Sequence, residues 1–136
     1  MPRVLVIDDD EDFRHYLVAL LKRAGYEVLS LQDSGRAKVM LAAECVDAVV
    51  TDLYMPNVDG IEIVNLVRES SPMVPVMGIS GSGLGARDPC IQAMKVLGAT
   101  AVLTKPLKVD AFLTSLRDAI HAARQGHSTC RTVPPI

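Results

Sequence analysis

The sequence lacks several features that define common protein classes. It has no tryptophan, and aromatic residues make up only 4% of its 136 residues, so the core must consist of Val, Leu, Ile, Ala and Met side chains. No apolar run approaches the ~20 residues that a helix needs to cross a bilayer. The first apolar stretch is too short for a signal peptide and turns acidic at once. We therefore expect a cytoplasmic protein with no membrane association.

The sequence also has few cysteines, few histidines and no excess of positive charge. Cys45, Cys90 and Cys130 are far apart and form no C-x-x-C motif, a pattern typical of reduced, mostly buried thiols. The three histidines form no cluster with the spacing of metal ligands. A formal net charge of -2 argues against direct nucleic-acid binding through bulk charge. These absences exclude disulfide frameworks, histidine-rich metal sites and basic nucleic-acid surfaces.

The length of the chain and the alternation of two sequence patterns favour one α/β domain. A chain of 136 residues with 22% charged residues fits a single soluble core. Short apolar or β-branched runs alternate with stretches of helical period, and several runs are apolar almost throughout, as in strands covered on both faces. The predicted strands cover residues 3–7, 27–31, 47–51, 74–80 and 100–104.

Stretches of helical period lie between these runs and after the last one. They predict five helices, at 11–24, 35–45, 60–70, 87–97 and 108–124. Strands that alternate with helices predict a doubly wound, five-stranded parallel sheet with helices on both faces, and right-handed crossovers leave few topologies. The last residues contain two prolines and no period. We expect one domain over residues 1–124 and a flexible tail over 125–136.

An acidic run, "DDDED" at residues 8–12, follows the first predicted strand directly. Two like charges about 4 Å apart repel by roughly 1 kcal/mol in water and by more near a protein surface. Asp10, Glu11 and Asp12 fall at the start of the first helix, where the helix dipole favours negative charge by ~0.3–1 kcal/mol. Asp8 and Asp9 need another explanation, and they could serve as caps of that helix.

Polar residues close the other predicted strands as well. Ligands of open parallel sheets bind outside the carboxyl ends of the strands, near the point where the strand order reverses. In the order 2-1-3-4-5, Asp8, Asp9 and Asp52 would converge there, with Ser80 one strand away and Lys105 able to reach back. A helix cap alone does not explain this convergence.

Converging carboxylates suit a hard divalent cation such as Mg²⁺, which prefers oxygen ligands and leaves positions for a phosphate. A carboxylate beside Mg²⁺ can act as a nucleophile on phosphorus and give an aspartyl phosphate. Lys105 would offset the charge of the phosphoryl group, and the Ser80 hydroxyl would hold one of its oxygens. The strand ends therefore predict a magnesium-dependent phosphoryl-transfer site.

Four segments carry a resemblance to a known family. The segments "VLVIDDD" (4–10), "VVTDLYMPNVDGIEIV" (49–64), "GIS" (78–80) and "LTKPL" (103–107) resemble the receiver domain of bacterial two-component response regulators, in its stand-alone, single-domain form. The resemblance implies a flavodoxin-like fold with the strand order given above.

The resemblance also implies a role for each residue of the site. Asp52 would accept the phosphoryl group, and the Lys105–Pro106 bond would be cis. Mg²⁺ would be bound by Asp9, by Asp52 and by the backbone carbonyl of Tyr54, with Asp8 acting largely through water. Ser80 would be the switch hydroxyl and Lys105 the partner of the phosphate.

By the same resemblance, the chain would take its phosphoryl group from a sensor histidine kinase or a phosphotransfer protein. It would assist its own phosphorylation and dephosphorylation without being a turnover enzyme. An unknown output protein would bind the face made by the fourth helix, the fifth strand and the fifth helix.

Other interpretations remain to be weighed against this one. The first alternative is a receiver-like interaction module that signals without phosphorylation, although the complete set of strand-end residues argues against it. A phosphohydrolase with an aspartate nucleophile is the second, because residues 8–10 fit its D-x-D pattern. Dinucleotide binding is excluded, because the first strand leads into acids and not into G-x-G-x-x-G.

Three departures from the family concern how a signal is passed on. Val102 stands where an aromatic ring is usual, Leu107 stands where Phe often follows Lys-Pro, and the segment at 80–90 is longer than usual and rich in glycine. We expect the loop at 81–89, and not an aromatic ring, to respond to phosphorylation.

Overall fold

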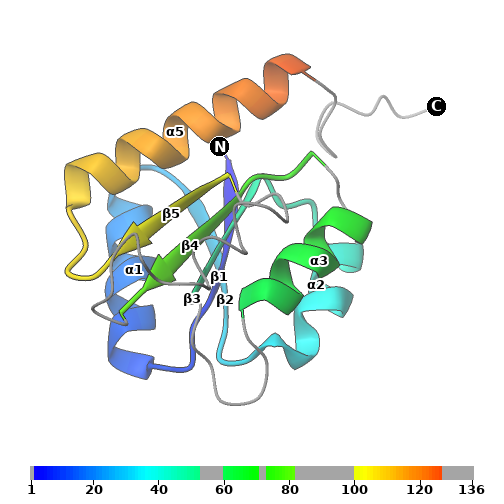
Figure 1. Cartoon of the computed structure of the whole chain (residues 1–136), viewed down its shortest axis with the longest axis horizontal. Coiled ribbons are helices and arrows are strands. Elements are labelled where there is room, and N and C mark those ends of the chain that lie inside the picture. The colour runs from blue at the N-terminus through cyan, green and yellow to red at the C-terminus, as the bar shows by residue number, and fades with distance from the viewer. Residues whose placement is uncertain (1, 53–59, 71–72, 82–99, 127–136) are drawn as a thin grey trace.

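The chain folds into a five-stranded parallel sheet with helices on both faces (Figure 1). The computed structural model describes residues 2–52, 60–70, 73–81 and 100–126. The strand order β2-β1-β3-β4-β5, with every pair parallel, confirms the predicted topology. The strands are β1 (Arg3–Ile7), β2 (Glu27–Leu31), β3 (Ala48–Asp52), β4 (Val76–Ser80) and β5 (Ala101–Thr104).

The described helices follow the predicted pattern, with differences at their ends. They are α1 (Glu11–Arg23), α2 (Ala37–Ala43), α3 (Gly60–Ser70) and α5 (Val109–Gly126), and a 3₁₀ turn, η1 (Ser34–Arg36), precedes α2. The second predicted helix is therefore a tight turn followed by a short α-helix, and α5 continues two residues beyond the predicted end of the domain at 124. The predicted helix at 87–97 lies outside the described residues.

Two apolar layers hold the helices to the sheet. Alternate residues of each strand point to opposite faces, so Val4 and Val6 pack with α1 and α5, whereas Leu5 and Ile7 pack with α2 and α3. Figure 1 shows these helix pairs on opposite sides of the sheet. Burial on both faces is the physical reason why the three central strands, β1, β3 and β4, are nearly continuous apolar runs.

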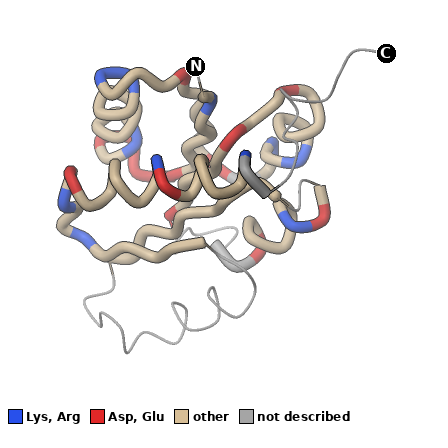
Figure 2. The backbone as a smooth tube through the Cα atoms, turned by 90° about the horizontal axis from the view of Figure 1, so that it is seen from above, with Lys and Arg blue, Asp and Glu red and all other residues tan. Residues whose placement is uncertain are grey.

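Charged residues are confined to the edges of this sandwich. Within the strands they occur only at first or last positions, as Arg3, Glu27 and Asp52. The others lie on helices and connections (Figure 2). Among the described residues, no helix is long and apolar enough to cross a membrane.

Buried Asp47 anchors the edge of the sheet that carries the amino ends of the strands. Its carboxylate accepts the backbone N–H of Arg3 at 2.8 Å and a guanidinium N–H of Arg124 at 3.3 Å. Arg3 itself pairs with Glu27 and Glu44. These bonds tie the last turns of α5 to the start of β1 and to the residue before β3.

The ends of α1 have clear local causes. Asp10 is the N-cap, and its carboxylate accepts the backbone N–H groups of Asp12 and Phe13 at 3.0 and 3.2 Å. The interpretation of Asp8 and Asp9 as caps of this helix is therefore wrong. The helix closes at Gly25, whose φ of 99° lies in the left-handed region that glycine adopts readily.

The capping role of Asp10 can be separated from its charge. Asp10→Asn keeps an acceptor oxygen, whereas Asp10→Ala removes it, and both variants lose the charge. We expect Asp10→Ala to be about 1 kcal/mol less stable than Asp10→Asn, measured by urea unfolding at neutral pH. Equal stability of the two variants would contradict the assignment of the cap.

Candidate functional site

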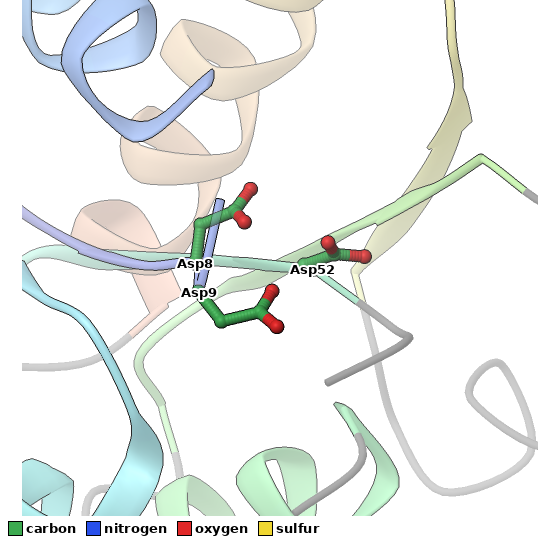
Figure 3. A group of neighbouring side chains, drawn as sticks. All are labelled: Asp8, Asp9 and Asp52. Carbon is green, nitrogen blue, oxygen red and sulfur yellow. The ribbon is translucent and has the colours of Figure 1, made fainter. Parts of the chain in front are cut away.

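Three carboxylates meet where the strand order reverses. Asp8 and Asp9 follow β1, and Asp52 is the last residue of β3, the strand next to β1. One carboxylate oxygen from each lies within 4.8 Å of the other two, and Figure 3 shows Asp8 and Asp9 turned to the side where Asp52 lies. Asp8 and Asp52 are 1% and 7% exposed, whereas Asp9 is exposed. We call these residues the acidic cluster.

The backbone of Asp8 is fixed on both sides, which fixes the position of its carboxylate. Its N–H donates to the carbonyl of Leu31 at 3.2 Å, and its carbonyl accepts a guanidinium N–H of Arg14 at 2.9 Å. Its Oδ1 accepts the N–H of Asp10 at 2.9 Å. Its Oδ2 is buried and has no hydrogen-bond partner within the described part of the chain. An unpaired buried carboxylate oxygen is costly, and it indicates a place for a ligand.

The same environment raises the pKa of Asp8 to about 6. Burial is the largest cause, and the charges of Asp52 and Asp9 add to it. The N–H of Asp10 and the charge of Lys105 act in the opposite direction. At neutral pH the cluster therefore holds several negative charges that burial and mutual repulsion disfavour.

The donor set fits a hard divalent cation. All three contributors are carboxylate oxygens, which Mg²⁺ prefers, and they are close enough together to bind one ion. The unpaired Oδ2 of Asp8 supplies an acceptor that no described donor satisfies. The residues present therefore suit a magnesium site at the carboxyl edge of the sheet.

Lys105 brings a positive charge to the acidic cluster. It follows β5, and its Nζ lies 3.8 Å from Oδ2 of Asp52 and 4.2 Å from the centre of the Phe13 ring. Its backbone N–H donates to the carbonyl of Ser80 at 2.8 Å. The Lys105–Pro106 bond is cis, which confirms the expectation from the resemblance.

Ser80 lies at the corresponding end of β4 and is 2% exposed. Asp52 pairs with Ile79 across the sheet, so Ser80 stands one residue beyond Asp52 on the neighbouring strand. The structure thus places Ser80 beside the site, and it places Lys105 within the reach that the sequence indicated. Tyr54, the remaining predicted ligand, lies outside the described residues.

Sequence reasoning missed two neighbours of Lys105. Phe13 lies in the predicted helix at 11–24, where an apolar residue indicates only packing, and Gly81 lies in the glycine-rich segment at 80–90. A Cβ atom added at Gly81 would lie 3.1 Å from Cδ of Lys105, so the lysine chain runs directly against this glycine. No sequence pattern gives these contacts, because they depend on how closely α1 and β4 approach the end of β5.

Val102 and Leu107, two positions at which the sequence departs from the family, are packing residues in the structure. Val102 packs, partly buried, on the cluster under α2 and α3. Leu107 packs on the cluster under α1 and α5. The loop at 81–89, which we expect to respond to phosphorylation, lies outside the described residues from position 82 onward.

Comparisons with known proteins give a consistent match. A family model described as the response regulator receiver domain matches residues 4–117. Regulatory protein VirG of Rhizobium rhizogenes is 38% identical over 132 residues, which are 97% of this chain and 52% of VirG. The response regulator receiver protein CpdR of Brucella abortus is 32% identical over 123 residues, 90% of this chain and 100% of CpdR. The chain therefore spans about half the length of that VirG protein but the full length of CpdR.

Solved structures agree with the sequence relatives. A response regulator receiver domain protein from Clostridium thermocellum has a TM-score of 0.83 and 28% identity, with 93% of this chain and 100% of that chain covered. The chemotaxis protein CheY4 of Vibrio cholerae has a TM-score of 0.77 and 28% identity, with 88% and 98% covered.

The raised pKa of Asp8 predicts how stability depends on pH. The folded state holds the Asp8 proton more tightly than an unfolded chain with a pKa of 3.8, so the stability present at low pH is lost as pH rises through about 6. Asp8→Asn keeps an acceptor for the N–H of Asp10 and removes this loss. In EDTA we expect the stability of Asp8→Asn relative to wild type to grow by roughly 2 kcal/mol between pH 4.5 and pH 7.5.

Urea unfolding at both pH values measures this difference, and the comparison with wild type cancels the titration of the groups that do not interact with Asp8. Asp12→Asn serves as the matched control, because Asp12 belongs to the same acidic run but is exposed on α1. A stability difference for Asp8→Asn that does not change with pH would refute the prediction.

Proposed function

Because the chain belongs to the family of response regulator receiver domains, which are phospho-accepting signalling domains, we propose that Asp52 receives the phosphoryl group. The observation that carries this proposal is the surroundings of Asp52. It is 7% exposed, it belongs to the acidic cluster, and its Oδ2 lies 3.8 Å from the ammonium group of Lys105. A nucleophile for phosphorus needs such a position, beside a metal site and a fixed cation.

The other two acids of the cluster are less suited to this role. One oxygen of Asp8 is engaged by the N–H of Asp10, and burial raises the pKa of the carboxyl to about 6. Asp9 is exposed. We propose that Asp8 and Asp9 hold Mg²⁺ together with Asp52 and the backbone carbonyl of Tyr54, with Asp8 acting largely through water. When bound, the ion would supply positive charge to the phosphoryl oxygens.

The phosphoryl donor in this proposal is a phosphohistidine of a sensor histidine kinase or a phosphotransfer protein. An Asp52 oxygen attacks the phosphorus atom, the new O–P bond forms, and the N–P bond breaks with its electron pair left on the imidazole. The Lys105 ammonium offsets charge on the phosphoryl oxygens. The Ser80 hydroxyl, on the neighbouring strand end, donates to one of them.

We further propose that phosphorylation acts on an output protein through the face that includes β5 and α5. The predicted helix at 87–97, which would complete this face, lies outside the described residues. The chain would assist its own phosphorylation and dephosphorylation but would not turn over a substrate. The alternative module that signals without phosphorylation has no observation in its favour.

Phosphorylation should require both Asp52 and Mg²⁺. After incubation with acetyl phosphate and Mg²⁺, we expect wild type to gain the mass of one phosphoryl group, and Asp52→Asn or wild type in EDTA to gain none. Intact-mass spectrometry measures the uptake. Asp12→Asn is the control and should behave as wild type. Uptake by Asp52→Asn equal to that of wild type would exclude Asp52 as the acceptor.

A further inference from the structure

Within the described ranges, the ammonium group of Lys105 has two partners. Asp52 Oδ2 lies 3.8 Å from Nζ, and the centre of the Phe13 ring lies 4.2 Å from the same atom. A cation within about 6 Å of a ring centre is attracted by the negative face of the ring. The lysine is thus held between a carboxylate on β3 and an aromatic ring on α1.

The ion pair alone is a weak restraint on this lysine. At 3.8 Å it lies near the outer limit of a salt bridge, and the side chain of Lys105 is 29% exposed. Partly exposed pairs at such distances contribute little, because water screens them and because a long side chain loses rotamer freedom when it is fixed. A second contact is needed to hold the ammonium at the site.

Phe13 is itself well fixed for this purpose. Its ring packs, partly buried, on the apolar cluster under α1 and α5. It also lies 5.9 Å from the ring of Tyr16, at an angle of 39°. Its backbone N–H is bound to Asp10, the cap of α1. The position of the ring is therefore set by the helix start and by the core, and not by the lysine.

The stem of Lys105 runs close to Gly81. Its Cδ would lie 3.1 Å from a Cβ atom at position 81, so the absence of a side chain at Gly81 leaves the path of the lysine open. The backbone of Lys105 is fixed by its bond to the carbonyl of Ser80. Gly81 beside the stem and the Phe13 ring beside the ammonium group together restrict the conformation of the Lys105 side chain.

From these contacts we infer that Phe13 is a positioning residue, which holds the ammonium group of Lys105 beside Asp52 for phosphoryl transfer. The inference rests on the proposed function of Asp52. Any apolar side chain at position 13 could pack on the apolar cluster under α1 and α5, but only an aromatic ring attracts the cation. The ring reduces the rotamer freedom that Lys105 must lose when it binds the incoming phosphoryl group.

The first test compares variants at position 13. In the reaction with acetyl phosphate, an Asp52 oxygen forms a bond to phosphorus and acetate leaves. We expect Phe13→Leu, which keeps apolar volume, to slow this reaction on the order of 3-fold. Phe13→Tyr, which keeps the ring, should restore the wild-type rate. Tyr26→Leu is the matched control, because it removes a partly buried ring of the same apolar cluster just before β2, at the amino edge of the sheet, and it should leave the rate unchanged.

A double-mutant cycle separates positioning from a general effect on packing. In Lys105→Gln, which lacks the cation, the added change Phe13→Leu should not slow the residual reaction further. If Phe13→Leu slows the reaction equally in both backgrounds, its effect does not pass through Lys105 and the inference is overturned.

Proton NMR of the unphosphorylated protein tests the contact itself. Protons of the Lys105 side chain that lie over an aromatic face resonate upfield, so this shift should be present in wild type and in Phe13→Tyr and lost in Phe13→Leu. A wild-type protein without the shift would overturn the inference, as would a Phe13→Leu rate equal to wild type. Absence of phosphate uptake by wild type would instead overturn the proposed function, and the two failures are thereby distinguished.

Discussion

The carboxylates of the acidic cluster repel one another, because one oxygen from each lies within 4.8 Å of the other two. The fold holds them together in spite of this repulsion. Parallel strands deliver Asp8 and Asp52 to the same edge of the sheet, and the buried core beneath them prevents either from moving into water. Lys105 compensates part of the charge from 3.8 Å, but Oδ2 of Asp8 has no partner among the described residues. Residual negative charge of this kind, on oxygen ligands, suits a divalent cation.

Much of the fold could be predicted from the sequence, because its determinants are local or periodic. The runs at residues 3–7 and 27–31 are strands in the structure with the same bounds. The first of them is buried at every position after Arg3, as expected for a nearly continuous apolar strand that is covered on both faces. The polar residues at strand ends then gave the acidic cluster and Lys105, because the carboxyl ends of parallel strands share one edge. The sequence therefore predicts the order of the helices and strands and the residues that lie at the strand ends.

The details that escaped prediction depend on distances between elements. In a run of five acids, the sequence does not tell which one caps α1, and the structure assigns Asp10. The 3₁₀ turn before α2 and the two further residues of α5 are details of helix ends, which fray and often form 3₁₀ turns. The contact of Phe13 with Lys105 joins α1 to the residue after β5, and the helical period of residues 11–24 gives no sign of it. The role of Tyr54 and of the loop at 81–89 stays a prediction.

The two edges of the sheet differ in how strongly they are tied. At the amino ends of the strands, Asp47 joins Arg3 and Arg124 through bonds that span 44 and 77 residues of sequence, and its charge is met by protein donors. Substitutions there remove a partner from a buried carboxylate and would weaken the attachment of the last helix. At the carboxyl ends, charges are left for ligands to satisfy. The bonds of Asp47 therefore maintain the register of the strands from the amino edge, and a ligand that binds to the acidic cluster at the carboxyl edge does not have to break them.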